Sequence, residues 1–243
     1  MLVKIPAEGN SFLDRRDPRA RILLALFGSF FLAPVHEQSA AVFGLALALA
    51  LALLGKLPWR PLLKRLAAIN FFLLFLWLSV PFIQKGETFS RAGVDLVLLV
   101  TLKSNALVLW LITLLSTMTP AVLGYALEQL RFPSKLVFLL VFTYRYLHVA
   151  VEEWAKLLTA AKLRGFSPRC GLRAYKNMGN LLGMTFIRSF ERSLRVHEAM
   201  LLRGFTGVFR PVSSFRFSAV DMAFLGVIFL ILSGIWAWDK LAE

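Results

Sequence analysis

Residues 96–116 read LVLLVTLKSNALVLWLITLLS, an apolar run that is interrupted by one charge, at Lys103. A helix needs roughly 17 to 25 mostly apolar residues to cross the hydrocarbon core of a bilayer. Because lipid offers the backbone no hydrogen-bonding partner, a chain that crosses as a single segment crosses as a helix. Residues 96–116 therefore predict a transmembrane helix, and with it an integral membrane protein.

Four further apolar runs surround this one, at residues 22–33, 39–54, 66–83 and 220–238. The first two are short and are separated only by residues 34–38, which predicts a tight hairpin. The chain as a whole is 58% hydrophobic and 17% charged, with a mean hydropathy of +0.69. Its only cysteine is Cys170, so a disulfide scaffold is excluded. We expect an all-α integral membrane protein with about five transmembrane helices.

The basic residues near the ends of these runs predict the topology, because lysine and arginine concentrate in cytoplasmic loops. The loop between the first and second runs has none, and the loop between the third and fourth has two, Lys85 and Arg91. The N-terminal segment and the loop between the second and third runs are richer; they carry Lys4, Arg15, Arg16, Arg19 and Arg21, and Lys56, Arg60, Lys64 and Arg65. The N-terminus is therefore expected inside. Charges this close to the first run also argue against a cleavable signal peptide.

Residues 117–216 follow the fourth run and are expected in the cytoplasm, where they place 15 Lys and Arg against 5 Asp and Glu. Pro120 is expected to open a short helix, and Pro133 with Ser134 a longer one toward Leu163. An alternative makes residues 136–150 a sixth span. That span would contain Arg145 and would put the remaining basic stretch outside, against the charge rule.

A basic amphipathic helix is expected further along this segment. Apolar residues recur at helical spacing on one face, namely Leu182, Phe186, Phe190, Leu194 and Leu201. Arg188, Arg192 and Arg195 fall on the opposite face. Such a helix lies on anionic lipid, docks a partner or is simply solvated, and periodicity does not separate these alternatives.

One short pattern occurs twice, 39 residues apart. Residues 160–167 read AAKLRGFS and residues 199–206 read AMLLRGFT, each at the end of an expected helix. A glycine that ends a helix explains part of the pattern, because glycine accepts the left-handed conformation and arginine complements the helix dipole. Capping does not explain why both ends carry the same leucine, arginine and phenylalanine. Two matched arginine tips indicate docking into two acidic grooves, where a guanidinium bonds a carboxylate with two hydrogen bonds.

These residues resemble the transmembrane T component of energy-coupling factor (ECF) transporters, the ATP-driven importers of vitamins and metals. That family carries two Ala-Arg-Gly-like motifs at the ends of cytoplasmic coupling helices. Here they correspond to Leu163, Arg164 and Gly165, and to Leu202, Arg203 and Gly204. Both first positions are leucine rather than alanine, which enlarges the apolar contact. Further similarities, in the family's order, are the stretches DPRA at 17–20, LRFP at 130–133, YRY at 144–146 and EE at 152–153.

The resemblance implies an L-shaped arrangement in three parts: an N-terminal bundle of four spans (1–116), coupling helices (117–216) and a C-terminal span (217–243). Two ATP-binding-cassette subunits would receive the arginine motifs, and a separate membrane subunit, the S component, would bind the substrate. Residues 193–205 look most similar to the cobalt or nickel type, CbiQ, with biotin or another vitamin as the alternative. The implied location is the bacterial inner membrane, with the N-terminus and the coupling helices cytoplasmic.

The sequence contains no recognisable motif for nucleotide binding, metal binding or catalysis. It has no G-x-x-x-x-G-K-[ST] loop to cradle phosphates, so ATP and Mg are expected on the partner ATPases and no cofactor in this chain. The three histidines, His36, His148 and His197, lie in different segments and predict neither a metal site nor a catalytic site. A membrane-embedded enzyme is disfavoured because the predicted spans contain no histidine and no close pair of carboxylates. Topology and partner docking account for the net charge of +14 without nucleic acid.

Lys103 is the one charge near the middle of a span. It is expected to contact either the bundle or the S component, or to reach the membrane interface if the span is displaced. A self-contained secondary transporter remains a competing class, although it would carry charges in several spans and inverted repeats of hydropathy.

Overall fold

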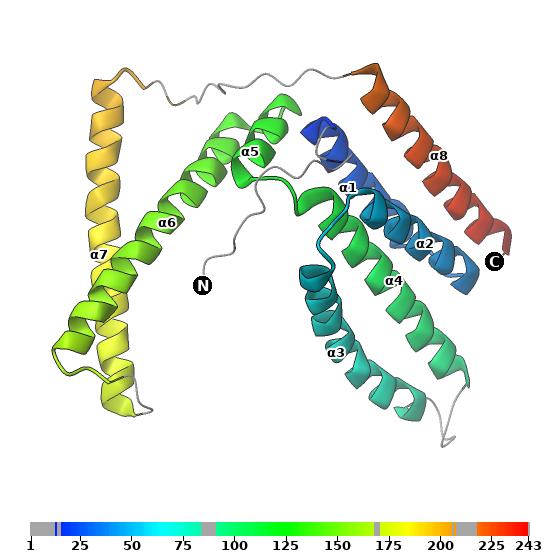
Figure 1. Ribbon diagram of the computed structural model, residues 1–243, viewed down its shortest axis with the longest axis horizontal. Helices are drawn as coiled ribbons and strands as arrows, with labels where there is room; N and C mark the ends of the chain where they lie inside the picture. Colours follow the sequence, from blue (N-terminus) through cyan, green and yellow to red (C-terminus); the bar gives the residue numbers. More distant parts are fainter. Residues whose placement is uncertain are drawn as a thin grey trace. The chain divides into compact units, whose positions relative to one another are not determined.

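The computed structural model describes residues 13, 16–83, 91–167, 171–205, 207 and 218–242. Over these residues the secondary structure is entirely helical, in eight helices (Figure 1). The expected all-α membrane fold is therefore confirmed. Cys170 and Lys85 lie outside the described residues. The helices are α1 (Pro18–Leu32), α2 (Gln38–Leu54), α3 (Trp59–Ile83), α4 (Arg91–Leu115), α5 (Pro120–Gln129), α6 (Ser134–Leu163), α7 (Leu172–Leu202) and α8 (Ala219–Ala242).

Prolines mark the start of three helices. α1 starts at Pro18, and the Asp17 carboxylate accepts a hydrogen bond of 2.9 Å from the Arg19 amide. That bond satisfies one of the amides that a helix start leaves unpaired. Pro120 opens α5, and Pro133 stands directly before α6. The predicted helix starts at Pro120 and Ser134 are therefore confirmed.

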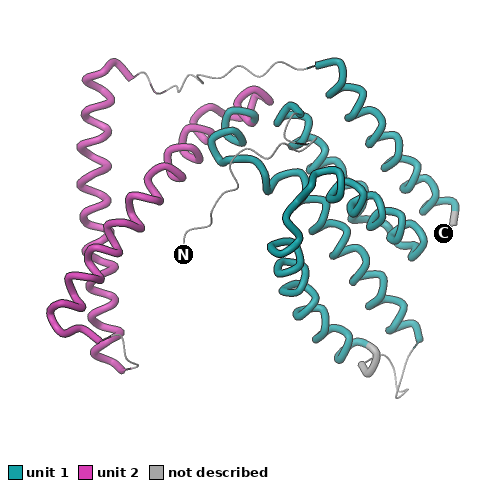
Figure 2. Tube along the Cα trace, in the orientation of Figure 1, with its two compact units in different colours: residues 1–126, 214–243 teal, residues 127–213 magenta. Residues whose placement is uncertain are grey.

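The chain divides into two compact units, residues 1–126 with 214–243, and residues 127–213 (Figure 2). In the first unit α4 packs against α1, α2 and α3, while α8 packs against α1 and α2. Trp110 of α4 is fully buried, and its indole N–H donates a 3.0 Å hydrogen bond to the Leu24 carbonyl of α1. Gly28 of α1 permits this contact, because a Cβ there would lie only 2.1 Å from the indole ring.

Among the residues that the structure describes, four helices have the length and hydropathy to cross a membrane: Trp59–Val80, Arg91–Leu115, Ser134–Leu163 and Ala219–Leu241. Three of them correspond to predicted spans. The other two predicted spans fall in α1, which has 15 residues, and α2, which has 17. α6 meets the criterion although we expected it in the cytoplasm, because its first half is apolar and its charges lie mainly in the second half.

The outer face of α3 is strongly apolar. Phe71 is 79% exposed, and Phe72 and Phe75 are exposed to 68% and 67%. Apolar side chains in this number would be unfavourable in water but are in their preferred surroundings in lipid. The exposed surface of α3 therefore fits a membrane environment.

The second unit contains the hairpin of α6 and α7. The two helices run in opposite directions and cross (Figure 1). On α6 only Val137 is buried, and no side chain of α7 is. The five predicted apolar residues share one face of α7 and are exposed; they are Leu182 (46%), Phe186 (74%), Phe190 (65%), Leu194 (48%) and Leu201 (54%).

Candidate functional site: the two helix ends of the hairpin

The first repeated motif forms the end of α6. Gly165 follows the last turn with a φ of +85°, in the left-handed region that favours glycine. The Phe166 amide donates to the Ala161 carbonyl and the Gly165 amide to the Lys162 carbonyl, each over 3.0 Å. This pair of bonds is a Schellman cap, which satisfies carbonyls that the helix end would otherwise leave unpaired.

The second motif repeats this geometry at the end of α7. Gly204 has a φ of +79°. The Phe205 amide donates to the Met200 carbonyl over 3.0 Å, and the Gly204 amide to the Leu201 carbonyl over 2.9 Å. The expectation that both glycines end helices in the left-handed conformation is confirmed. The repeat in sequence is thus a repeat in backbone structure.

The two ends also present matching side chains. Leu163 is 84% exposed and Leu202 is 90% exposed, and the arginines that follow them, Arg164 and Arg203, are exposed as well. Phe205 instead turns toward α6, where its ring lies 5.3 Å from that of Phe138. Each cap needs its glycine and the backbone amide of the phenylalanine that follows it. Neither cap needs the leucine side chain or the arginine guanidinium. These exposed side chains are available to a partner.

A hollow of about 520 Å³ lies beside the first motif, between the end of α6 and the first half of α7. Arg164 contributes positive charge to it, and Asn177 and Asn180 contribute amides; Arg188 also lines it, with its guanidinium bound to Glu153. None of the described residues that line it is a carboxylate. The surroundings of the first motif therefore favour a negatively charged partner.

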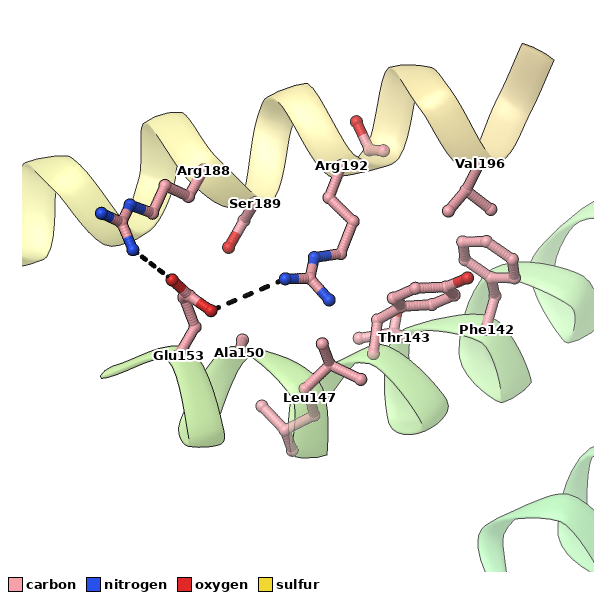
Figure 3. Close-up of a pocket in the computed structure, with 12 residues that line it drawn as sticks. Phe142, Thr143, Leu147, Ala150, Glu153, Arg188, Ser189, Arg192 and Val196 are labelled. Carbon is pink, nitrogen blue, oxygen red and sulfur yellow. Dashed lines mark hydrogen bonds and ion pairs between the residues drawn. The ribbon is translucent and has the colours of Figure 1, made fainter. Parts of the chain in front are cut away.

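α6 and α7 are joined by an ion cluster near the middle of the hairpin (Figure 3). The Glu153 carboxylate of α6 accepts a 2.5 Å hydrogen bond from Arg188 and lies 3.6 Å from the guanidinium of Arg192. Sequence analysis placed these arginines on one face of the helix but left their partner open. The partner is 35 residues away in the chain, and spacing within α7 gives no sign of it.

Lys103 lies within the first unit, where its amine donates a 2.7 Å hydrogen bond to the Val35 carbonyl between α1 and α2. Asp239 of α8 is fully buried beside the same loop and accepts the amides of His36, over 2.9 Å, and Glu37, over 2.8 Å. A lysine of α4 and a carboxylate of α8 thus hold the connection between α1 and α2.

Sequence reasoning missed two charged residues of the first unit. Asp239 was not singled out, and Arg21 was counted only as a topology signal. Arg21 is only 3% exposed; it donates a 3.1 Å hydrogen bond to the Leu114 carbonyl and a further one to the Thr117 hydroxyl. The only signal in the sequence was that each of these charged residues adjoins the end of a predicted span. Over the part of the chain that the structure describes, no group of three or more His, Cys, Asp or Glu side chains gathers as a candidate metal site.

Apolar helices of membrane-spanning length, with two exposed basic helix ends built alike, define the protein as a multi-pass membrane component. The profile of the CbiQ family, described as cobalt transport protein, matches residues 9–213, so the chain belongs to this family. The resemblance inferred from the two motifs is thereby confirmed.

Curated relatives carry a more general description. The energy-coupling factor transporter transmembrane protein EcfT of Listeria innocua is 32% identical over 95% of this chain and 94% of its own length. The protein of the same name from Brevibacillus brevis is 29% identical over 94% of this chain and 95% of its own. EcfT of Bacillus subtilis is 25% identical over 85% of this chain and 85% of its own length. These relatives are transmembrane components of transporters.

Proposed function

We propose that this chain is the energy-coupling transmembrane subunit of an ECF importer, which passes ATP-driven motion of two ATPase subunits to a substrate-binding membrane subunit. One observation carries the proposal: two helix ends with the same cap each expose a leucine and an arginine that the fold does not use. Two equivalent tips suit two equivalent grooves on a pair of ATPase subunits. The family match supports this assignment.

In this mechanism the chain works as a lever and performs no chemistry. The partner ATPases bind ATP and Mg and close on each other, and each would carry one of the two arginine tips with it. The helices α6 and α7 would pass this displacement to the substrate-binding subunit. The exposed apolar face of α7 is a candidate surface for that transfer, since it has no cover among the described residues.

We propose cobalt or nickel ion as the substrate, because the matching family is described as cobalt transport protein. A vitamin such as biotin is the alternative, since the EcfT relatives carry no substrate in their names. The proposed location is the bacterial inner membrane, with the N-terminus and both arginine tips on the cytoplasmic side. The basic residues near the predicted spans support this orientation.

Reversing both tip charges tests the docking assignment. The double variant Arg164→Glu/Arg203→Glu should insert into the membrane normally and lose the ATPase subunits in affinity purification, and each single variant should lose fewer. Arg173→Glu/Arg195→Glu is the matched control, because it makes the same change of charge at two exposed positions of α7. If the double tip variant still assembles and transports, docking through these arginines is wrong.

Affinity purification of the wild-type chain, with and without ATP and vanadate, tests the class of protein. Two ATP-binding-cassette subunits and a small membrane protein should co-purify, and the small protein would identify the substrate class. A chain that purifies alone and transports in liposomes would instead be a self-contained transporter.

A further inference from the structure

We propose that Glu153 is a positioning residue: by holding Arg188 and Arg192 it fixes the crossing of α6 and α7, and so the relative placement of the two arginine tips. The consequence for docking rests on the proposed function. The consequence for the hairpin itself does not.

We call the contact of Glu153 with Arg188 and Arg192 the clasp. The Glu153 side chain is only 13% exposed, whereas those of Arg188 and Arg192 are 46% and 41% exposed. The two arginines stand one helical turn apart on α7 and approach from the same side (Figure 3). One oxygen of the carboxylate faces each guanidinium, at 2.5 Å and 3.6 Å. A single sheltered carboxylate therefore binds two successive turns of the opposite helix.

Apolar packing gives little to hold the helices in one arrangement. No side chain of α7 is buried, and α6 buries only Val137. Next to the clasp lies a hollow of about 330 Å³, which apolar side chains such as Phe142, Leu147 and Val196 line without filling. Close packing normally fixes how two helices cross. Where it is incomplete, a charge-assisted hydrogen bond has a larger share in fixing the angle.

The clasp also lies midway between the two tips. Arg164 follows Glu153 by 11 residues on α6, and Arg203 follows Arg192 by 11 residues on α7. Because the helices run in opposite directions, these arms point away from each other, each about 16 Å long at 1.5 Å per residue. A change of about 20° in the crossing angle, comparable to the scatter within one packing class, would move a tip by about 6 Å. A displacement of that size would spoil simultaneous insertion into two grooves.

A distance measurement tests the clasp without any partner. Spin labels at Arg145→Cys and Glu198→Cys, in a Cys170→Ser background, report the separation of α6 and α7 in the full chain in nanodiscs. We expect one narrow distance distribution for the parent and a distribution at least twice as broad for Glu153→Gln, which keeps the shape and removes the charge. Glu153→Asp should restore most of the narrow distribution.

Glu152→Gln is the matched control, since it removes the neighbouring charge at an exposed position that makes no ion pair with any described residue. It should leave the distribution narrow. A narrow distribution for Glu153→Gln, or equal broadening for Glu152→Gln, overturns the proposal.

A binding cycle tests the consequence for docking. If Glu153 acts by placing two tips at once, Glu153→Gln should weaken ATPase binding about tenfold when both tips are intact, because two linked contacts gain from correct spacing. In an Arg203→Glu background only one tip remains, and the same substitution should change binding less than twofold. A general loss of structure would weaken binding in both backgrounds and would overturn the positioning role.

The two proposals fail in distinguishable ways. If Arg164→Glu/Arg203→Glu does not reduce ATPase binding, the docking assignment is wrong and the docking role of Glu153 falls with it. The spin-label distances are unaffected by that result and decide by themselves whether Glu153 holds the hairpin.

Discussion

The left-handed glycine at the end of α6 gives a prediction with a definite size. Gly165 has a φ of +85°, and a Cβ added there would meet nothing within 4 Å. Substitution by alanine therefore costs no packing, only the backbone penalty of the left-handed region, about 1 kcal/mol. That penalty corresponds to about a fivefold rise in the population in which the cap is open. Asparagine tolerates this conformation better than alanine, so Gly165→Asn should have a smaller effect.

Amide hydrogen exchange measures this opening directly. The amides of Gly165 and Phe166 donate the two hydrogen bonds of the cap, so their exchange should accelerate about fivefold in Gly165→Ala. Gly204→Ala should do the same at the end of α7. Gly183→Ala is the matched control: it lies inside α7, again with nothing within 4 Å of the added Cβ, and should stabilise the helix by about 0.5 to 1 kcal/mol.

Two results would refute this reasoning. Unchanged exchange at Gly165 and Phe166 would mean that the left-handed conformation does not limit the cap. Faster exchange in Gly183→Ala as well would mean that any added methyl group disturbs the hairpin. If docking needs an ordered helix end, ATPase binding should follow the series Gly, Asn, Ala in that order.

Two further predictions concern the first unit. Asp239→Asn should destabilise the bundle by about 1.5 to 3 kcal/mol, because the carboxylate that accepts hydrogen bonds from two backbone amides loses its charge. Thermal unfolding in detergent measures this loss of stability. The control Asp95→Asn, at an exposed position, should show almost no loss. Gly28→Ala should cost about 1 to 3 kcal/mol, because the new Cβ meets the Trp110 ring at 2.1 Å. Gly234→Ala on α8 meets nothing within 4 Å and, like Gly183→Ala, should stabilise its helix slightly, so the unfolding temperature should not fall; an equal loss in both glycine variants would contradict the account of the contact with Trp110.

Local sequence was sufficient to predict two helix starts and two helix ends. A proline directly before or at the first turn, and a glycine just after the last, act through the backbone of neighbouring residues. This is why the helix starts at Pro120 and Ser134 and the left-handed Gly165 and Gly204 agree with the structure. The apolar runs were equally informative for α3, α4 and α8, because hydropathy over one span is a property of that span alone.

The membrane assignment of α6 shows where local reasoning reaches its limit. Its first half is apolar and its second half is charged, so length and hydropathy favour a span while the loop charges favour the cytoplasm. The hydropathy criterion considers α6 itself, whereas the charge criterion considers the lysine and arginine residues of the loops around it. Their disagreement arises because one continuous helix carries both kinds of surface.

The sequence by itself determined that this protein is helical, that it belongs in a membrane and that two helices end in the same exposed tip, because each of these follows from residues within a few turns of one another. Only the tertiary structure decided which charges meet. Lys103 finds a carbonyl 68 residues away, and Glu153 finds two arginines on the opposite helix. Charge partners depend on how helices cross, and a crossing is set by packing over the whole unit rather than by any local pattern.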